Sequence, residues 1–128
     1  MALIRSFLCL LLAFSCTSCL DLNPGKTTIY EGYYVSDDVA EPFKTLYLEV
    51  KSGYSVERCP NVTRVGYKQG YLFIEAPSGN YWFAVKDDKG WNSLDPAAAL
   101  LLNGPLTITE YQQAVRQLGV GEVAYQFL

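Results

Sequence analysis

Residues 62–86, VTRVGYKQGYLFIEAPSGNYWFAVK, decide the fold of this chain. Three runs rich in Tyr, Val, Ile and Phe, at 62–67, 71–76 and 81–86, are separated by the short segments KQG and PSGN. β-Branched and aromatic residues favour strands, and connections this short join neighbouring antiparallel strands. The stretch therefore predicts an antiparallel meander.

Further strands are expected on both sides of this meander. Residues 27–34, 44–51 and 122–127 have a similar composition and alternate between apolar and more polar positions. The alternation is clearest in the middle segment, where one face is purely aliphatic and comprises Leu46, Leu48 and Val50. We expect that face to point into a core and the other face to point outward.

One helix is predicted over residues 108–118. Thr107 is its expected N-cap, and Glu110 completes a capping box three residues later. Gly119 suits the left-handed conformation that commonly ends a helix. The face that should lie against the sheet is apolar and comprises Ile108, Tyr111, Ala114, Val115 and Leu118.

A shorter helical turn is predicted over residues 96–102. Asp95 and Pro96 form a typical N-cap and first-turn pair, and the alanines and leucines that follow favour helix. We expect the leucines to pack on the rim of the sheet, and a membrane-inserting loop is the alternative. The predicted fold class is therefore α+β: a small, mainly antiparallel β-sheet of five to six strands, packed by the helix at 108–118 and the helical turn at 96–102.

The first nineteen residues have the pattern of an export signal. Arg5 precedes an apolar run at 7–14 that is too short to span a bilayer, and a small-residue segment then ends at Cys19. This ending resembles the lipobox of bacterial lipoproteins, whose cysteine receives a lipid and becomes the new N-terminus. Cys16 is the alternative lipidation site, but Phe14 is bulky where that family's peptidase requires a small side chain. An ordinary secretory signal is a further alternative.

The lipobox resemblance implies a domain organisation and a location. It implies a signal peptide over 1–18, a lipidated tether over 19–26 and, from the length that remains, a single domain over 27–128. The partner at the N-terminus is then a membrane, reached through the lipid anchor. Because Leu20 rather than aspartate follows the cysteine, the resemblance favours the outer membrane or the cell surface of a bacterium.

Charge and composition argue against several classes of function. The chain has a net charge of −3, which becomes −4 when the signal segment with Arg5 is removed. No run of Lys or Arg forms a basic stripe, so nucleic acid is a poor partner. The chain also has no histidine, the commonest general base and transition-metal ligand.

Cys59 is the only cysteine after position 19. If Cys19 carries the lipid, we predict a lone, buried thiol at Cys59. If Cys16 carries it instead, Cys19 is free to form a disulfide with Cys59. Pro60 follows in an apparent turn, and without a histidine to activate the thiol no nucleophilic role is expected.

Acidic residues gather at two places in the sequence. Asp37, Asp38 and Glu41 form one group, and Asp87 and Asp88 form the other. Neither group has the alternating spacing of a calcium loop, so both are interpreted as solvated turns. We therefore predict no catalytic residue, no metal site and no cofactor. An enzyme would instead require a concave pocket that gathers carboxylates with shifted pKa values.

The chain is rich in aromatic residues, with ten Tyr and two Trp. Strand propensity explains most of them, but some alternate strand positions must face outward. Exposed Tyr and Trp anchor protein interfaces or stack on sugars. The candidate interface residues are Tyr47, Tyr81, Trp82 and Trp91. They lead to the hypothesis of a noncatalytic module that binds another envelope protein or a cell-wall component.

Three patterns occur in order in the second half of the chain. They are VxxVGxxxxYLxxE over 62–75, YWxxV over 81–85 and GPLTxxEYxxxxxxLGV over 104–120. This arrangement resembles a family of small uncharacterised bacterial lipoproteins. The resemblance implies a fold and an envelope address, and it brings no catalytic residues. Similar helix entries occur in some immunity-type proteins. An immunity or inhibitor lipoprotein that uses the acidic group at 37–41 against a toxin or envelope enzyme is therefore the alternative function.

Overall fold

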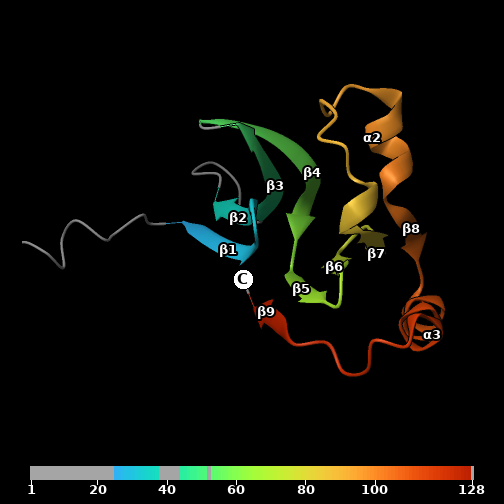
Figure 1. Cartoon of the computed structure of the whole chain (residues 1–128). Coiled ribbons are helices and arrows are strands. Elements are labelled where there is room, and N and C mark those ends of the chain that lie inside the picture. Colours follow the sequence, from blue (N-terminus) through green and yellow to red (C-terminus); the bar gives the residue numbers. More distant parts are fainter. Residues whose placement is uncertain (1–24, 38–43, 52, 128) are drawn as a thin grey trace, which may run out of the picture.

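The computed structural model describes residues 25–37, 44–51 and 53–127. Within these ranges the chain forms two antiparallel sheets, two α-helices and one short 3-10 helix (Figure 1). The predicted α+β class, with mainly antiparallel strands and a helix late in the sequence, is confirmed.

The first sheet, sheet A, is built in sequence order. Its strands are β1 (Lys26–Tyr30), β2 (Tyr33–Asp37), β3 (Lys44–Lys51) and β4 (Tyr54–Val62). Each pairs antiparallel with the next, and β3 and β4 are joined with several register shifts. Such irregularities bend a strand and increase its twist.

The second sheet, sheet B, has the strand order β8-β7-β6-β5-β9. Its strands are β5 (Arg64–Lys68), β6 (Tyr71–Ala76), β7 (Gly79–Ala84), β8 (Asn103–Leu106) and β9 (Tyr125–Phe127). The predicted meander is confirmed as β5, β6 and β7, in which Ile74 pairs with Val65 on one side and with Tyr81 on the other.

The described residues contain more strands than the five to six expected. Residues 27–34 form parts of two strands, because the chain turns at Gly32, whose φ is 82°. The turn predicted at Pro60 is wrong, since this residue lies inside β4. Pro60 is tolerated there because β4 is an edge strand that pairs only with β3. β8 lies in a segment for which no strand was expected, and the 3-10 helix η1 (Val85–Asp87) ends β7 early.

The chain passes from sheet A to sheet B at Thr63, where β4 leads directly into β5 (Figure 1). The backbone N–H and the hydroxyl of Thr63 both donate to the carbonyl of Glu75, at 2.8 and 2.9 Å. These bonds hold the crossing point against β6. The crossing lets one continuous segment supply strands to both sheets.

Two apolar cores lie on opposite faces of sheet B. The inner core, between the sheets, comprises Tyr33, Val35, Leu46, Cys59, Val62, Val65, Leu72, Ile74, Phe83 and Leu101. The outer core, on the helix side, comprises Phe73, Tyr111 and Val120. Neighbouring residues of β6 belong to different cores, as the alternation of side chains along a strand requires. Sheet B is therefore covered on both faces.

The predicted helical turn is confirmed as α2 (Pro96–Leu101), in which the Asp95 side chain accepts a bond from the N–H of Ala97. Leu101 is buried, but Leu100 is 83% exposed. The expectation that all the leucines are covered is therefore wrong for Leu100, because consecutive residues of a helix point in different directions. Among the described residues, no helix combines the length and the apolar character needed to cross a membrane.

The helix predicted at 108–118 is confirmed as α3 (Ile108–Leu118). Its capping box is present between Thr107 and Glu110, and Gly119 ends it with a φ of 68°. Tyr111 is buried in the outer core, whereas Ile108 is 53% exposed. The predicted burial of Ile108 is wrong, because this first residue of α3 lies beyond the outer-core contacts and on the rim of a groove.

Candidate functional site

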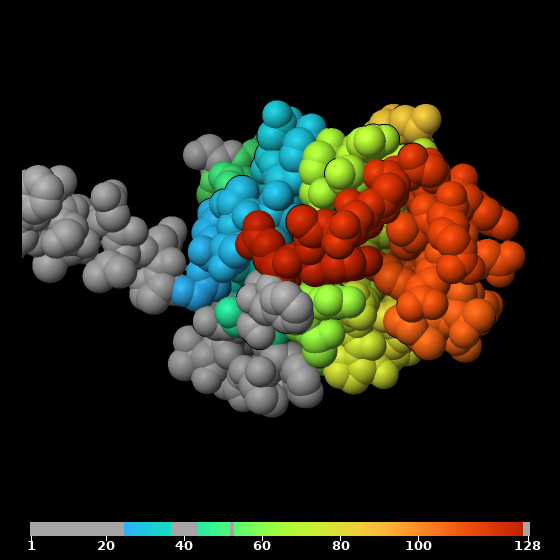
Figure 2. All heavy atoms as spheres, turned by 90° about the horizontal axis from the view of Figure 1, so that it is seen from below, coloured from blue at the N-terminus to red at the C-terminus, as the bar shows by residue number. Residues whose placement is uncertain are grey.

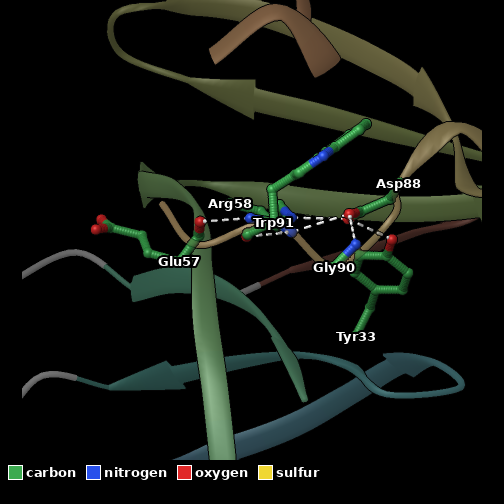
Figure 3. A network of polar contacts seen from close by, with 6 residues as sticks. All are labelled: Tyr33, Glu57, Arg58, Asp88, Gly90 and Trp91. Carbon is green, nitrogen blue, oxygen red and sulfur yellow. Dashed lines mark hydrogen bonds and ion pairs between the residues drawn. The ribbon is translucent and has the colours of Figure 1, made fainter. Parts of the chain in front are cut away.

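A buried ion pair joins Arg58 of β4 to Asp88, which follows η1 (Figure 3). Their side chains are 1% and 0% exposed. Arg58 Nε and Nη2 donate to the two carboxylate oxygens at 2.7 and 2.9 Å, and Nη2 also donates to the carbonyl of Trp91 at 2.9 Å. The Tyr33 hydroxyl and the Gly90 N–H complete the shell of Asp88, at 2.7 and 2.9 Å.

The pKa values around this pair follow from its contacts. Burial by itself would raise the pKa of Asp88, but the bonds from Arg58, Gly90 and Tyr33 outweigh it and hold this pKa below its ordinary value. Burial and the bond to Asp88 raise the pKa of Tyr33. No buried side-chain nitrogen or oxygen in the described ranges lacks a hydrogen-bond partner. The pair is therefore satisfied and fixes the segment after η1 onto β4.

This pair corrects the interpretation of the second acidic group as a solvated turn. Asp87 is exposed, as expected, but the Asp88 side chain is buried. Its partner Arg58 lies thirty residues earlier, so no local pattern indicates the contact. Of the first acidic group, Asp38 and Glu41 lie outside the described residues, as does the side chain of Asp37. Within the described residues, no three His, Cys, Asp or Glu side chains gather closely enough to hold a metal ion.

Cys59 is a free, buried cysteine in β4. Burial, assisted by the charge of Glu57, raises the pKa of its thiol to about 11. A thiol with so high a pKa is largely protonated and a weak nucleophile at neutral pH. The predicted signal segment at 1–18, Cys19 and its alternative Cys16 lie outside the described residues, so the signal segment and the lipidation site both stay predictions.

The four aromatic residues proposed as an interface lie in different surroundings, and each is half-buried. Tyr47 of β3 stacks on Tyr34, with ring centroids 5.5 Å apart. Tyr81 and Trp91 pack against the inner core, whereas Trp82 packs against the outer core. The structure therefore does not bring the four side chains together at one place.

Two open grooves are lined by residues other than these four aromatic residues. The tyrosine groove, with a volume of about 370 Å³, lies where the two sheets meet. Its lining residues are Tyr30, Tyr67, Gln69, Gly70, Tyr71, Ala84, Val85 and Lys86. The rings of Tyr30 in β1 and Tyr67 in β5 are stacked in parallel, with centroids 3.8 Å apart. This stack joins sheet A to sheet B.

The arginine groove, with a volume of about 320 Å³, lies between α3 and the segment that leads into β9. Its lining residues are Arg64, Ile108, Tyr111, Gln112, Val115, Arg116, Gly121, Glu122, Val123 and Tyr125. Figure 2 looks onto this side of the molecule, where the red segment after α3 runs beside the orange helix and on toward the blue β1.

A polar network lies along the floor of the arginine groove. Arg64 of β5 forms an ion pair with Glu75, and its guanidinium carbon lies 4.2 Å from the centroid of the Tyr125 ring. The hydroxyls of Tyr125 and Tyr111 are hydrogen-bonded to each other. Burial is the main cause that raises the pKa of both tyrosines, so both hydroxyls are protonated at neutral pH. The bond to Glu75 raises the pKa of Arg64, which is therefore always charged.

Sequence reasoning missed both grooves. Tyr30 and Tyr67 are far apart in the chain, as are Arg64 and Arg116, and each pair meets only through sheet pairing or helix packing. The one available signal was the set of Tyr residues in strands, which does not distinguish the members of a groove from the rest.

Comparisons with protein-family models, with curated proteins and with solved structures give no significant match for this chain. The resemblance to small bacterial lipoproteins therefore rests on the sequence patterns alone. The geometry of the described residues carries the functional argument.

Proposed function

We propose that this chain is a non-enzymatic lipoprotein of the bacterial cell envelope, attached to the membrane through lipid on Cys19. Its domain acts as a binding module at the outer membrane or cell surface. The observation that carries the binding role is the tyrosine groove, in which strands of both sheets bring Tyr30, Tyr67 and Tyr71 to one open hollow.

The composition of this groove suits a protein partner. Tyrosine rings supply a large and rigid contact area at a small cost in conformational entropy. Tyr30 and Tyr67 hold each other in place by stacking, and the Gly70 N–H donates to the Tyr67 hydroxyl at 3.0 Å. Gln69 and Lys86 supply polar groups beside the rings. This combination of fixed aromatic anchors and a polar edge is typical of protein interfaces.

The binding role is tested by site-specific photo-crosslinking in intact cells. A photo-reactive phenylalanine at exposed Gln69 should crosslink an envelope protein, whereas the same group at Tyr54, which is 50% exposed and outside the groove, should not. Lys86→Glu should abolish the crosslinked product. Lys51→Glu, an exposed lysine that does not line the groove, should leave it unchanged. Capture of wall fragments in place of protein, or equal capture from both positions, contradicts the proposal.

The anchor is tested separately by mass spectrometry of the processed N-terminus. The proposal requires a lipidated Cys19 as the first residue, and Cys19→Ala should release the protein from membranes while Cys16→Ala should not. Lipid on Cys16 or a terminus without lipid would contradict it.

A further inference from the structure

The arginine groove gathers most of the arginine side chains of the domain. Only three arginines follow the signal segment, and they are Arg58, Arg64 and Arg116. Arg58 is buried in its pair with Asp88, and the other two both line this groove. The guanidinium group is the cation best suited to bidentate recognition of a planar anion. The presence of both Arg64 and Arg116 in one groove is notable because the chain as a whole carries a net negative charge.

The two arginines of the groove differ in their contacts. Arg64 is held by its ion pair with Glu75 and by the face of the Tyr125 ring, which fixes the orientation of its charge. Arg116 lies in the last turn of α3 and is exposed. Within the described part of the chain, the Arg116 side chain makes no hydrogen bond and no ion pair. The groove therefore combines one preorganised cation with one available cation.

The walls of the same groove are apolar. Ile108 is 53% exposed at its rim, and Val115 and Val123 are half-buried along its sides. An exposed isoleucine beside two cations provides a place for an aliphatic group that carries a negative charge. The volume of about 320 Å³ lies at the lower end of the range for ligand pockets, so the ligand must be small or must be the end of a chain.

We propose that the arginine groove binds the terminal carboxylate of a short apolar peptide, with the carboxylate between Arg64 and Arg116 and the aliphatic side chains against Ile108, Val115 and Val123. The single acidic residue of the lining, Glu122, is available to accept an N–H of the peptide. This site shares no residue with the tyrosine groove, so its occupation and the proposed function are independent.

The probes are N-acetyl-leucyl-leucine, which ends in a carboxylate, and its carboxamide, which differs only in that charge. Isothermal titration calorimetry with the whole protein should show that the peptide with the carboxylate binds at least about tenfold more tightly than the carboxamide, as expected for hydrogen bonds to a charged group. Equal affinity of the two peptides, or no binding of the carboxylate, overturns the proposal.

Two substitutions separate the groove from a general charge effect. Arg116→Gln changes an exposed residue and should weaken binding of the carboxylate by about tenfold without changing binding of the carboxamide. Lys51→Gln removes an equal charge outside the groove and should leave both affinities unchanged. Equal losses of affinity in the two variants would show that the carboxylate responds only to the overall charge of the protein, and this result would overturn the proposed site. Displacement of the peptide by inorganic phosphate at a similar concentration would likewise overturn the choice of a carboxylate ligand.

Discussion

At the scale of single residues, the Arg58–Asp88 pair makes a direct prediction about stability. Asp88→Asn removes the negative charge and leaves a buried guanidinium without its counter-ion, so the free energy of unfolding should fall by about 3–5 kcal/mol. Urea unfolding followed by circular dichroism measures this change. Asp87→Asn, at the exposed neighbouring position, should change it by less than about 0.5 kcal/mol. Equal effects at the two positions would show that the pair is not buried in solution.

The same carboxylate predicts how stability depends on pH. The pKa of Asp88 is lower in the folded protein than the value of about 3.9 expected in the unfolded chain. Its ionised form therefore contributes stability above that value, and the contribution is lost as the pH falls through the lowered pKa of the folded state. The free energy of unfolding, measured in steps from neutral to acidic pH, should fall less steeply for Asp88→Asn than for the unaltered protein. Parallel curves would contradict this assignment.

Cys59 provides a chemical test of the inner core. With a pKa of about 11, its buried thiol should resist alkylation by iodoacetamide at neutral pH and should react once urea unfolds the chain. Mass spectrometry of the peptide that contains Cys59 measures the extent of reaction. A cysteine introduced at exposed Lys51 should react without urea and serves as the control. Rapid labelling of Cys59 in the folded protein would contradict its burial, and a disulfide to Cys19 would instead indicate lipidation at Cys16.

At the scale of elements, Gly66 allows the segment before β9 to approach β5. A Cβ atom at this position would lie 2.7 Å from Val123 Cγ1 and 2.9 Å from the carbonyl oxygen of Ala124. Gly66→Ala should therefore destabilise the domain by about 1–3 kcal/mol, as other overpacked sites do. Urea unfolding measures the loss. In a Val123→Ala background, Gly66→Ala should cost less stability but not zero, because the contact with the Ala124 carbonyl oxygen remains. An equal loss in both backgrounds would show that the contact with Val123 does not cause the destabilisation.

The elements that sequence reasoning located correctly are those with local signals. The meander β5–β7 follows from short loops between β-branched and aromatic runs, and α3 follows from its capping box and Gly119. β4 was missed because Pro60 indicates a turn unless the strand is known to lie at an edge, which is a property of the whole sheet. The division of residues 27–34 depends on a single glycine, Gly32, whose positive φ no alternation pattern reveals.

At the scale of the whole molecule, the candidate sites depend on contacts that no local pattern contains. The sequence singles out Trp82 and Trp91 as exposed anchors, but both are half-buried against cores. The tyrosine groove needs the junction of two sheets, and the arginine groove needs the chain after α3 to return beside β5 as β9. Tertiary packing also decides which alternate positions of a strand are exposed, so aromatic composition alone does not locate an interface.

The two tryptophans allow the cooperativity of the whole domain to be measured. Trp91 reports on the inner core and Trp82 on the outer core, and a Trp→Phe substitution at either position leaves the other as a single fluorophore. Because Leu72 and Phe73 are neighbours on β6 but pack in different cores, neither core can be lost without exposing the strand that supports the other. In each variant, urea unfolding followed by fluorescence should therefore coincide with unfolding followed by circular dichroism. If the Trp82 signal changes at a lower urea concentration, α3 and the outer core unfold separately, and the arginine groove would open before the sheets separate.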